Sequence, residues 1–506
     1  MKKIKILIFI FLFLLLVFLS LVPRSVEVLS GNYLFGFDQG RDLLAVKSIV
    51  IDHKPTLIGS EIGAGSAGFK GIFHGPFHYY FLAIPFFIFS GDPYGGMVLM
   101  LIFSLASITF AFYLARKLFG TNGGLITALL VAICPPLISQ ARFIWNSHPS
   151  TLFILLSFYF LYLSFKDKKF IFLASFFASF IYNFELAIAI PMSIAVIIFT
   201  VLFLKLKELK YYLLLVLGII LPFSPMILFE LKHDFIGLRG IYDYIFVHKE
   251  TNVTVYLLQI LLKEHFSVFI YNFFDTFPTQ RLIPPFLFFL SVFFPLVYYL
   301  KNEKNKYIKK FLIFLLILIP VNFLVFALLR NAVYIYYLID LNLAYIFFFS
   351  YSFWSAFNGN NFLIKIYLTA VLLILLVSGI ISAVKVYSYD INDYGGDAKI
   401  KGRIAAIDYI YNDAKKEKFS LLIFSPPVYT YPYDYLLWWY GEKKYGYQPN
   451  KDKKGLFYLL MEKDASKPLS YKGWMETVVK TGEVMETRQL PSGFLIQKRM
   501  EGKNEL

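Results

Sequence analysis

The chain has 506 residues, of which 58% are hydrophobic and 20% aromatic, and its mean hydropathy is +0.63. A water-soluble globular protein does not need so much apolar surface, so the composition indicates a polytopic helical membrane protein. The net charge is +16, and about +13 of it precedes Asp390, largely in short basic loops between apolar runs. That distribution is typical of the positive-inside rule, and we expect no nucleic-acid partner. The single cysteine, Cys134, excludes an internal disulfide and any multi-cysteine metal site.

The N-terminus predicts a first membrane span over Ile4–Val22. Its apolar core is long and no small-residue cleavage motif precedes Pro23, so we expect an uncleaved span whose N-terminus is cytoplasmic. Further predicted spans follow in chain order: Met97–Ala115, Leu125–Ile138, Leu152–Phe165, Phe170–Tyr182, Leu186–Leu204, Tyr211–Phe229, Pro285–Leu300, Phe311–Leu329, Val333–Phe349 and Phe362–Val386.

Another apolar run, Pro76–Phe89, is too short for a comfortable span. The positive-inside rule applied to the basic loops leaves two alternatives: either Pro76–Phe89 does not cross the membrane, or the chain crosses it once more at a span that the apolar runs do not reveal. Both alternatives place the segments of mixed chemistry on the outer face: Asn32–Tyr80, Gln140–Pro149, Glu230–Pro284, Arg330–Asn331 and the C-terminal tail. We therefore expect a multi-pass protein of the plasma membrane with an extracytoplasmic C-terminus.

The tail after Asp390 has the polar alternation of a folded domain. A helix is predicted over Lys399–Lys416, with strands at Phe419–Phe424, Leu456–Met461 and Gly493–Arg499. The predicted fold is thus an all-α polytopic membrane protein of about 11–13 transmembrane helices with a small C-terminal α/β domain. The predicted boundaries are 1–388 for the membrane domain, with its outer loop at 23–80, and 389–506 for the tail. An aromatic cluster over Tyr429–Tyr440 predicts either a domain core, an interfacial belt or a sugar-stacking platform.

Asp38, Arg41 and Asp42 follow the first span and are the first candidates for chemistry. A guanidinium binds phosphate oxygens as a bidentate fork, and a carboxylate can take a proton from an acceptor hydroxyl. The alternative is a solvated loop in which Asp38 caps a helix.

The next polar segment contains His74, His78 and Tyr80. Histidines four residues apart share a helix face and can bind a metal, but no accompanying glutamate motif is present. Interfacial polar aromatics at the headgroup level are the alternative. The sequence points to no particular cofactor, and it leaves open whether a divalent metal takes part.

Three further candidates, Arg142, Asn146 and His148, stand at the outer end of a span, and Arg330 stands at another. An outer arginine can reach lipid headgroups or hold the phosphate of a lipid-linked donor. Glu185 lies between two apolar runs, where a buried carboxylate is a functional candidate.

In order and spacing these motifs resemble the GT-C superfamily of membrane glycosyltransferases, in the protein mannosyltransferase and aminoarabinose-transferase branch. Asp38-Gln39-Gly40-Arg41-Asp42 matches the Asp and Arg of the early acidic motif, with Gln39 in place of Glu. His74-Gly75-Pro76-Phe77-His78-Tyr79-Tyr80 resembles the Lys-Pro-Pro-Leu-Tyr-Tyr-Tyr segment, with His74 in place of Lys. Arg142…Asn146 loosely matches an outer Ser-Arg…Asp motif.

The resemblance implies a glycosyltransferase that moves a sugar from a polyprenyl-phosphate donor to an acceptor hydroxyl on the outer face, with inversion. Asp38 would be the general base, and Arg41, His74 and Arg330 would bind the donor phosphate. The expected partners are that donor, a glycan, lipid or protein acceptor, and membrane lipids. The alternatives are a flippase or transporter of lipid-linked oligosaccharides and a polysaccharide polymerase or ligase. A flippase would place polar residues through the membrane midplane, where the predicted spans here are mostly apolar.

Overall fold

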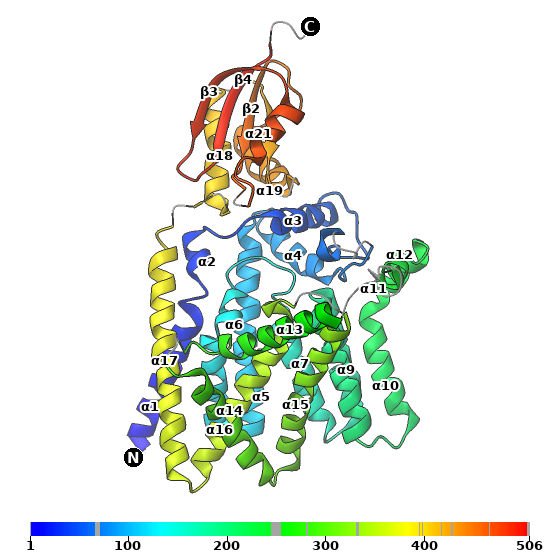
Figure 1. Ribbon diagram of the computed structural model, residues 1–506, viewed down its shortest axis with the longest axis vertical. Helices are drawn as coiled ribbons and strands as arrows, with labels where there is room; N and C mark the ends of the chain where they lie inside the picture. The colour runs from blue at the N-terminus through cyan, green and yellow to red at the C-terminus, as the bar shows by residue number, and fades with distance from the viewer. Residues whose placement is uncertain are drawn as a thin grey trace.

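Three layers follow one another along the long axis of the computed structural model (Figure 1). A helical bundle holds the N-terminus at one end, short helices form an outer layer above it, and a small sheet domain lies beyond that layer. The structure describes residues 2–65, 71–243, 255–279, 282–329 and 333–502, apart from positions 394, 397, 416, 427–428 and 465.

The bundle contains helices rich in leucine, isoleucine and phenylalanine. They are α1 (Lys2–Leu21), α5 (Tyr94–Ile133), α7 (Ser150–Ser164), α8 (Ile171–Phe180), α9 (Leu186–Phe203), α10 (Leu209–Ile220), α14 (Pro285–Lys301), α15 (Lys306–Leu329), α16 (Ile339–Asn358) and α17 (Phe362–Asp390). Helix α16 is buried on nearly every side, as expected of a central helix that is apolar all round. Helix α10 is largely exposed, which suits a helix that faces lipid.

Helix α5 reverses direction at Gly120, whose φ of 74° is left-handed. Gly124 lies against Phe112 and Arg116, which a continuous helix would hold more than a turn away. Arg24 then donates hydrogen bonds to both Ser104 and Ala132, one on each arm. The arms correspond to the predicted spans Met97–Ala115 and Leu125–Ile138, and the reversal at Gly120 lies between them.

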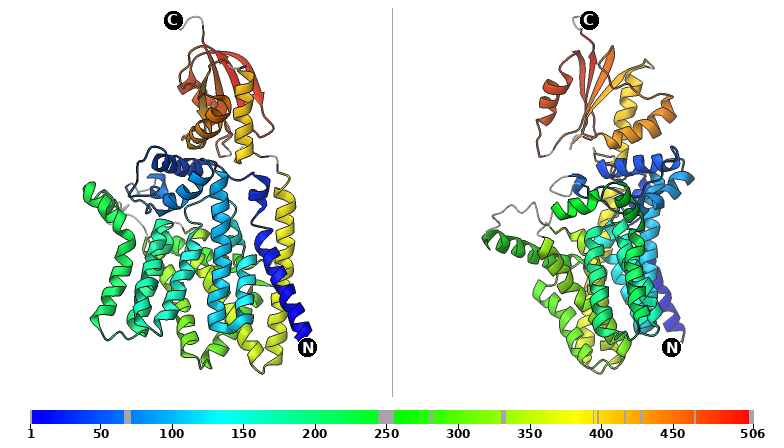
Figure 2. Two further views of the ribbon diagram at one scale, coloured as in Figure 1. Left: turned by 180° about the vertical axis from the view of Figure 1, so that it is seen from behind. Right: turned by 90° about the vertical axis from the view of Figure 1, so that its right-hand side faces the viewer.

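Five of the described helices are long and apolar enough to cross a membrane, and shorter apolar helices lie among them. The predicted fold class, a mostly helical membrane protein with a small C-terminal α/β domain, is confirmed. The basic loop between α14 and α15 lies at the end of the bundle that holds the N-terminus, opposite the sheet domain (Figures 1 and 2).

The outer layer consists of helices between the bundle and the sheet domain, all of them short except α13 (Figure 1). They are α2 (Val26–Ser30), α3 (Phe37–Val50), η1 (Ile62–Gly65), α4 (Phe77–Ile88), α6 (Pro135–Ser139), α11 (Ser224–Lys232), α12 (Ile236–Tyr242), α13 (Val255–Asp275) and η6 (Ile335–Leu338). Helix α4, the apolar run of ambiguous topology, lies in this layer beside α3 and does not enter the bundle.

The C-terminal domain is built from helices and a four-stranded sheet. Its elements are α18 (Ile400–Asp413), β1 (Ser420–Phe424), α19 (Tyr431–Leu436), η7 (Leu437–Glu442), α20 (Lys443–Tyr445), β2 (Leu456–Met461), α21 (Ser470–Trp474), η8 (Met475–Val479), β3 (Glu483–Gln489) and β4 (Leu495–Met500). The strand order is β1-β2-β4-β3, with β1 and β2 parallel and the other pairs antiparallel. Strand β2 is central and its side chains are buried on both faces.

The C-terminal domain shares a hydrophobic core with the outer layer. Phe35 and Leu43 belong to the same buried cluster as Ile407, Tyr433 and Tyr435. The backbone joins them too, because Phe35 N donates to Ala398 O at 3.1 Å and Ile400 N to Tyr33 O at 2.9 Å. The tail is therefore packed onto the outer layer as part of one structure.

Candidate functional site

Helix α3 carries the early acidic motif. Gly36 precedes its first turn and donates its N–H to Gln39 Oε1 at 2.8 Å, which satisfies a group that a helix N-terminus leaves free. Gln39 Nε2 donates to Ile144 O at 2.6 Å. Gln39 thus fixes α3 against the 140–149 loop. The predicted loop around Asp38 is a helix, and Asp38 lies in its first turn without capping it.

The three charged side chains of this turn form one network. Arg41 contacts Asp38 at 2.9 Å and Asp42 at 2.8 Å. Asp42 is buried, and His78 Nε2 lies 3.4 Å from its carboxylate. Tyr79 Oη lies 3.4 Å from the same group. Because α3 packs against α4, each side chain that contacts Asp42 is held by a helix.

The pKa values of Asp38 and Asp42 are shifted in opposite directions. Burial raises the pKa of Asp38 above its ordinary value, and the Arg41 charge offsets only part of that rise. Burial alone would raise the pKa of Asp42, but Arg41 and His78 hold it below its ordinary value. Asp42 is therefore a fixed anion, whereas Asp38, with 40% of its side chain exposed, is the one placed to exchange a proton.

Asp38 and Arg41 line a cavity of about 530 Å³. Segments distant in the chain complete its wall: Phe37, Ser60, Glu61, Ile62, Gly63, His74, Trp145, Asn146, Glu185, Tyr336, Tyr337 and Tyr429. Tyr429 comes from the C-terminal domain, 51% exposed, and its ring contacts Phe37 with a centroid separation of 5.5 Å. A cavity lined by a few polar groups among aromatic rings is typical of a small-molecule site.

His74 lies in this wall and is buried. Burial lowers its pKa to about 4, with the Arg41 charge acting in the same direction. Its Nδ1 has no hydrogen-bond partner among the described residues. His74 is thus a neutral imidazole at pH 7, which can offer a hydrogen bond but not a positive charge.

Glu185 enters the same cavity from the start of α9. It is 6% exposed, and its carboxylate accepts from Ala187 N at 3.2 Å as the cap of that helix. Burial raises the pKa of Glu185 to about 8. Asn146, another wall residue, donates to Phe184 O at 2.5 Å. A carboxylate between two apolar runs was the sequence signal for Glu185, and Tyr336 follows the outer Arg330 in the sequence, whereas nothing in the sequence pointed to Trp145.

The remaining candidates lie elsewhere. His148 is buried beside Phe143, whose carbonyl lies 2.8 Å from its ring nitrogen, and burial lowers its pKa to about 3. Tyr80 donates to Thr56 O at 2.6 Å and so braces the loop after α3. Neither side chain lines the cavity. Arg330 lies outside the described residues.

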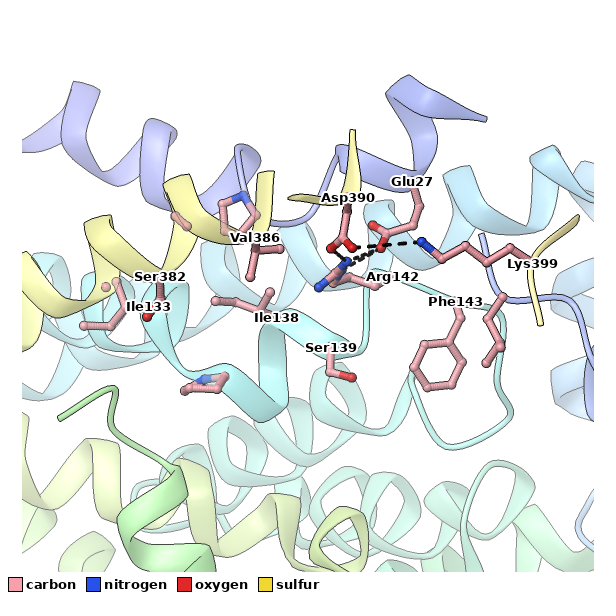
Figure 3. Close-up of a pocket in the computed structure, with 15 residues that line it drawn as sticks. Glu27, Ile133, Ile138, Ser139, Arg142, Phe143, Ser382, Val386, Asp390 and Lys399 are labelled. Atoms are coloured by element: carbon pink, nitrogen blue, oxygen red, sulfur yellow. Dashed lines mark hydrogen bonds and ion pairs between the residues drawn. The ribbon is translucent and has the colours of Figure 1, made fainter. Parts of the chain in front are cut away.

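Arg142 belongs to a second cavity, of about 570 Å³, between α2, α6 and α17. Its guanidinium pairs with Glu27 and Asp390, and Lys399 approaches Asp390 from the tail (Figure 3). Through these ion pairs, Arg142 joins its own loop to α2 and to the end of α17. The structure does not bring it to Asp38.

The side chains that commonly bind metals do not form a cluster in the part of the chain that the structure describes. No group of three or more His, Cys, Asp or Glu side chains there could hold a metal ion. The His74 and His78 pair predicted as a metal-binding face is divided between the cavity wall and Asp42.

Comparison with known proteins identifies the fold. Residues 73–229 match the family described as dolichyl-phosphate-mannose-protein mannosyltransferase. ArnT from Cupriavidus metallidurans bound to undecaprenyl phosphate superposes with a TM-score of 0.57, at 11% identity over 97% of each chain. ArnT in the apo state gives 0.55, at 12% identity over 98% of each chain.

An oligosaccharyltransferase from Archaeoglobus fulgidus, in complex with Zn and sulfate, gives a TM-score of 0.45 at 13% identity, over 95% of this chain and 72% of that one. The comparison with curated proteins finds no significant match. The predicted resemblance to the GT-C membrane glycosyltransferases is confirmed: one family model matches part of the bundle, and the ArnT structures share the fold.

Proposed function

We propose that this chain, which has the GT-C fold, transfers a sugar from a polyprenyl-phosphate donor to an acceptor hydroxyl on the outer face of the membrane. One observation carries the proposal. A carboxylate and a guanidinium, those of Asp38 and Arg41, lie 2.9 Å apart in the wall of a cavity in the layer above a membrane-spanning bundle. A donor whose lipid chain stays in the membrane can present its phosphate and sugar at that level.

Asp38 would act as the general base. The acceptor oxygen attacks the anomeric carbon of the sugar while Asp38 takes the hydroxyl proton, and the bond from that carbon to the phosphate oxygen breaks. The electron pair of the broken bond leaves with the polyprenyl phosphate. A single displacement of this kind inverts the anomeric carbon. The raised pKa of Asp38 suits the role, because a stronger base accepts the proton more readily.

Arg41 would stabilise the negative charge that grows on the leaving phosphate. Its guanidinium is held by Asp42 and Asp38, so it is oriented before a ligand arrives and does not need to reorganise during the reaction. His74 would add a neutral hydrogen bond to the same phosphate, in the position where the family has a lysine. Arg41 is the only cationic side chain that lines the described part of the cavity, so phosphate binding depends chiefly on it.

The test is transfer from radiolabelled polyprenyl-phosphate sugars by purified protein supplied with membrane extract. We expect Asp38→Asn to abolish transfer while the protein still folds, because an amide cannot take the proton. The matched control is Asp52→Asn, which removes an exposed carboxylate just beyond the end of the same helix. Retained transfer in Asp38→Asn would refute the assignment, and no transfer by the wild type from any donor would favour the flippase alternative.

A further inference from the structure

Glu185 is a buried acid that helix capping does not explain. The cap of α9 needs only one acceptor atom, which serine, aspartate or asparagine supplies at less cost. A carboxyl group that is 6% exposed is costly to bury as an anion, and it has no ion-pair partner among the described residues. We therefore expect Glu185 to have a role in the cavity that a smaller capping residue would not fill.

The surroundings of Glu185 indicate what it faces. It shares the cavity with Asp38 and Arg41, and its neighbours in the wall include Asn146, Tyr336 and Tyr337. The rings of Trp145 and Tyr336 are in contact, with centroids 4.5 Å apart, and form an aromatic surface in that wall. Neutral hydrogen-bonding groups beside an aromatic surface are complementary to a sugar, which has polar edges and an apolar face.

The protonation of Glu185 decides which kind of contact it makes. Burial, with only one backbone N–H to favour the anion, leaves the carboxyl group mostly protonated at pH 7. A protonated carboxyl group donates through its O–H and accepts through its carbonyl oxygen. It can therefore form a paired contact with a sugar hydroxyl, and it does not compete with Asp38 for the proton of the acceptor.

We propose that Glu185 is a specificity-determining residue that hydrogen-bonds one hydroxyl group of the donor sugar, in a subsite formed with Trp145 and Tyr336. This inference rests on the proposed function and adds to it how one sugar is told from another. Two donors that differ at that hydroxyl are discriminated because the mismatched donor leaves a buried polar group without its partner.

The experiment compares donors that each lack one sugar hydroxyl. The first variant, Glu185→Gln, keeps a neutral group that donates and accepts, so we expect transfer within about threefold of wild type. The second, Glu185→Ser, keeps the helix cap but does not reach the sugar. We expect it to lower transfer of the natural sugar by about tenfold, the worth of one hydrogen bond, through a raised KM for the donor. Glu208→Gln, on an exposed loop, is the control for expression and folding.

One deoxy donor should behave differently from the others. With the donor that lacks the contacted hydroxyl, Glu185→Ser should transfer at least as fast as wild type, because only the wild type then keeps a buried carboxyl group without a partner. An equal loss with every donor, or a loss in Glu185→Gln as severe as in Glu185→Ser, would overturn the inference. Those results are distinct from failure of the proposed function, in which the wild type transfers no sugar at all.

Discussion

Arg41 lies between two carboxylates, and only one of them faces the cavity. Asp42 is buried behind the guanidinium and is contacted by His78, so it orients Arg41 and does not reach a ligand. The negative charge of Asp42 also raises the pKa of Asp38. Asp42 is thus a positioning residue that affects the proposed base through its charge.

We predict that Asp42→Asn lowers kcat by roughly 10- to 100-fold, because Arg41 loses its fixed orientation. The pH profile should change as well. The proposed reaction requires ionised Asp38, and without the Asp42 charge the pKa of Asp38 falls, so the acidic limb of the kcat profile should move to lower pH. Rates measured across pH test this, with Asp52→Asn as the control. A lowered rate with an unmoved acidic limb would contradict the electrostatic role.

His74 makes the stability of the protein depend on pH. Its folded pKa of about 4 lies below its ordinary value of 6.5, so between these values the unfolded chain binds more protons. The contribution of His74 is complete above pH 6.5 and is lost as the pH falls towards 4, by at most about 3 kcal/mol. His74→Gln should flatten the fall in thermal midpoint over this range. His53→Gln, at an exposed site, should not.

At the scale of elements, the contact between α3 and α19 depends on a glycine. A Cβ atom on Gly40 would lie 2.4 Å from the backbone nitrogen of Pro432, closer than real side chains approach. The glycine between Gln39 and Arg41 therefore allows the C-terminal domain to lie directly on the helix that carries the proposed base.

We predict that Gly40→Ala separates α3 from α19 and destabilises their shared core by about 1–3 kcal/mol. Limited proteolysis should cut the C-terminal domain faster, and transfer should fall because Tyr429 leaves the cavity wall. Gly473→Ala is the matched control, since nothing lies within 4 Å of the added Cβ there. Unchanged proteolysis in Gly40→Ala would show that the contact adapts.

Apolar length and the placement of charges predicted the bundle, because lipid imposes both on any chain that crosses it. Strand β3 was missed because every residue of Glu483–Gln489 is exposed and its polar sequence has no buried face. The span was predicted to start at Val333, but α16 starts only at Ile339, because Ile335–Leu338 forms a separate 3-10 turn before it. That Asp38 and Arg41 lie side by side could be predicted from their spacing in the sequence. The positions of Trp145, Tyr336 and Tyr429 could not, because they depend on contacts between distant segments.

At the scale of the whole molecule, Arg142 joins parts of the chain that no single element connects. Glu27 follows the first span and Asp390 ends the last, and both carboxylates meet on its guanidinium (Figure 3). The partly buried pairs exclude much of the surrounding water, so the loss of the shared cation would leave two carboxylates facing each other.

We predict that Arg142→Met destabilises the protein by about 2 kcal/mol, less than for a fully buried pair because the guanidinium is partly exposed. The thermal midpoint in detergent should fall. Transfer by the folded fraction should stay near wild type, because Arg142 does not line the proposed site. Lost transfer with an unchanged midpoint would instead assign Arg142 to the chemistry.

The core shared by the outer layer and the C-terminal domain has a consequence for biosynthesis. During translation α3 and α4 emerge early, but the residues that cover them, Ile400 to Tyr435, are made only after every bundle helix has been synthesised. The nascent chain must therefore keep an apolar surface uncovered for most of its synthesis, a state that invites association with chaperones. Because Tyr429 completes the cavity wall, a chain that ends before Tyr429 also lacks a complete site, and we expect the proposed sugar transfer to wait until that part of the chain has been made.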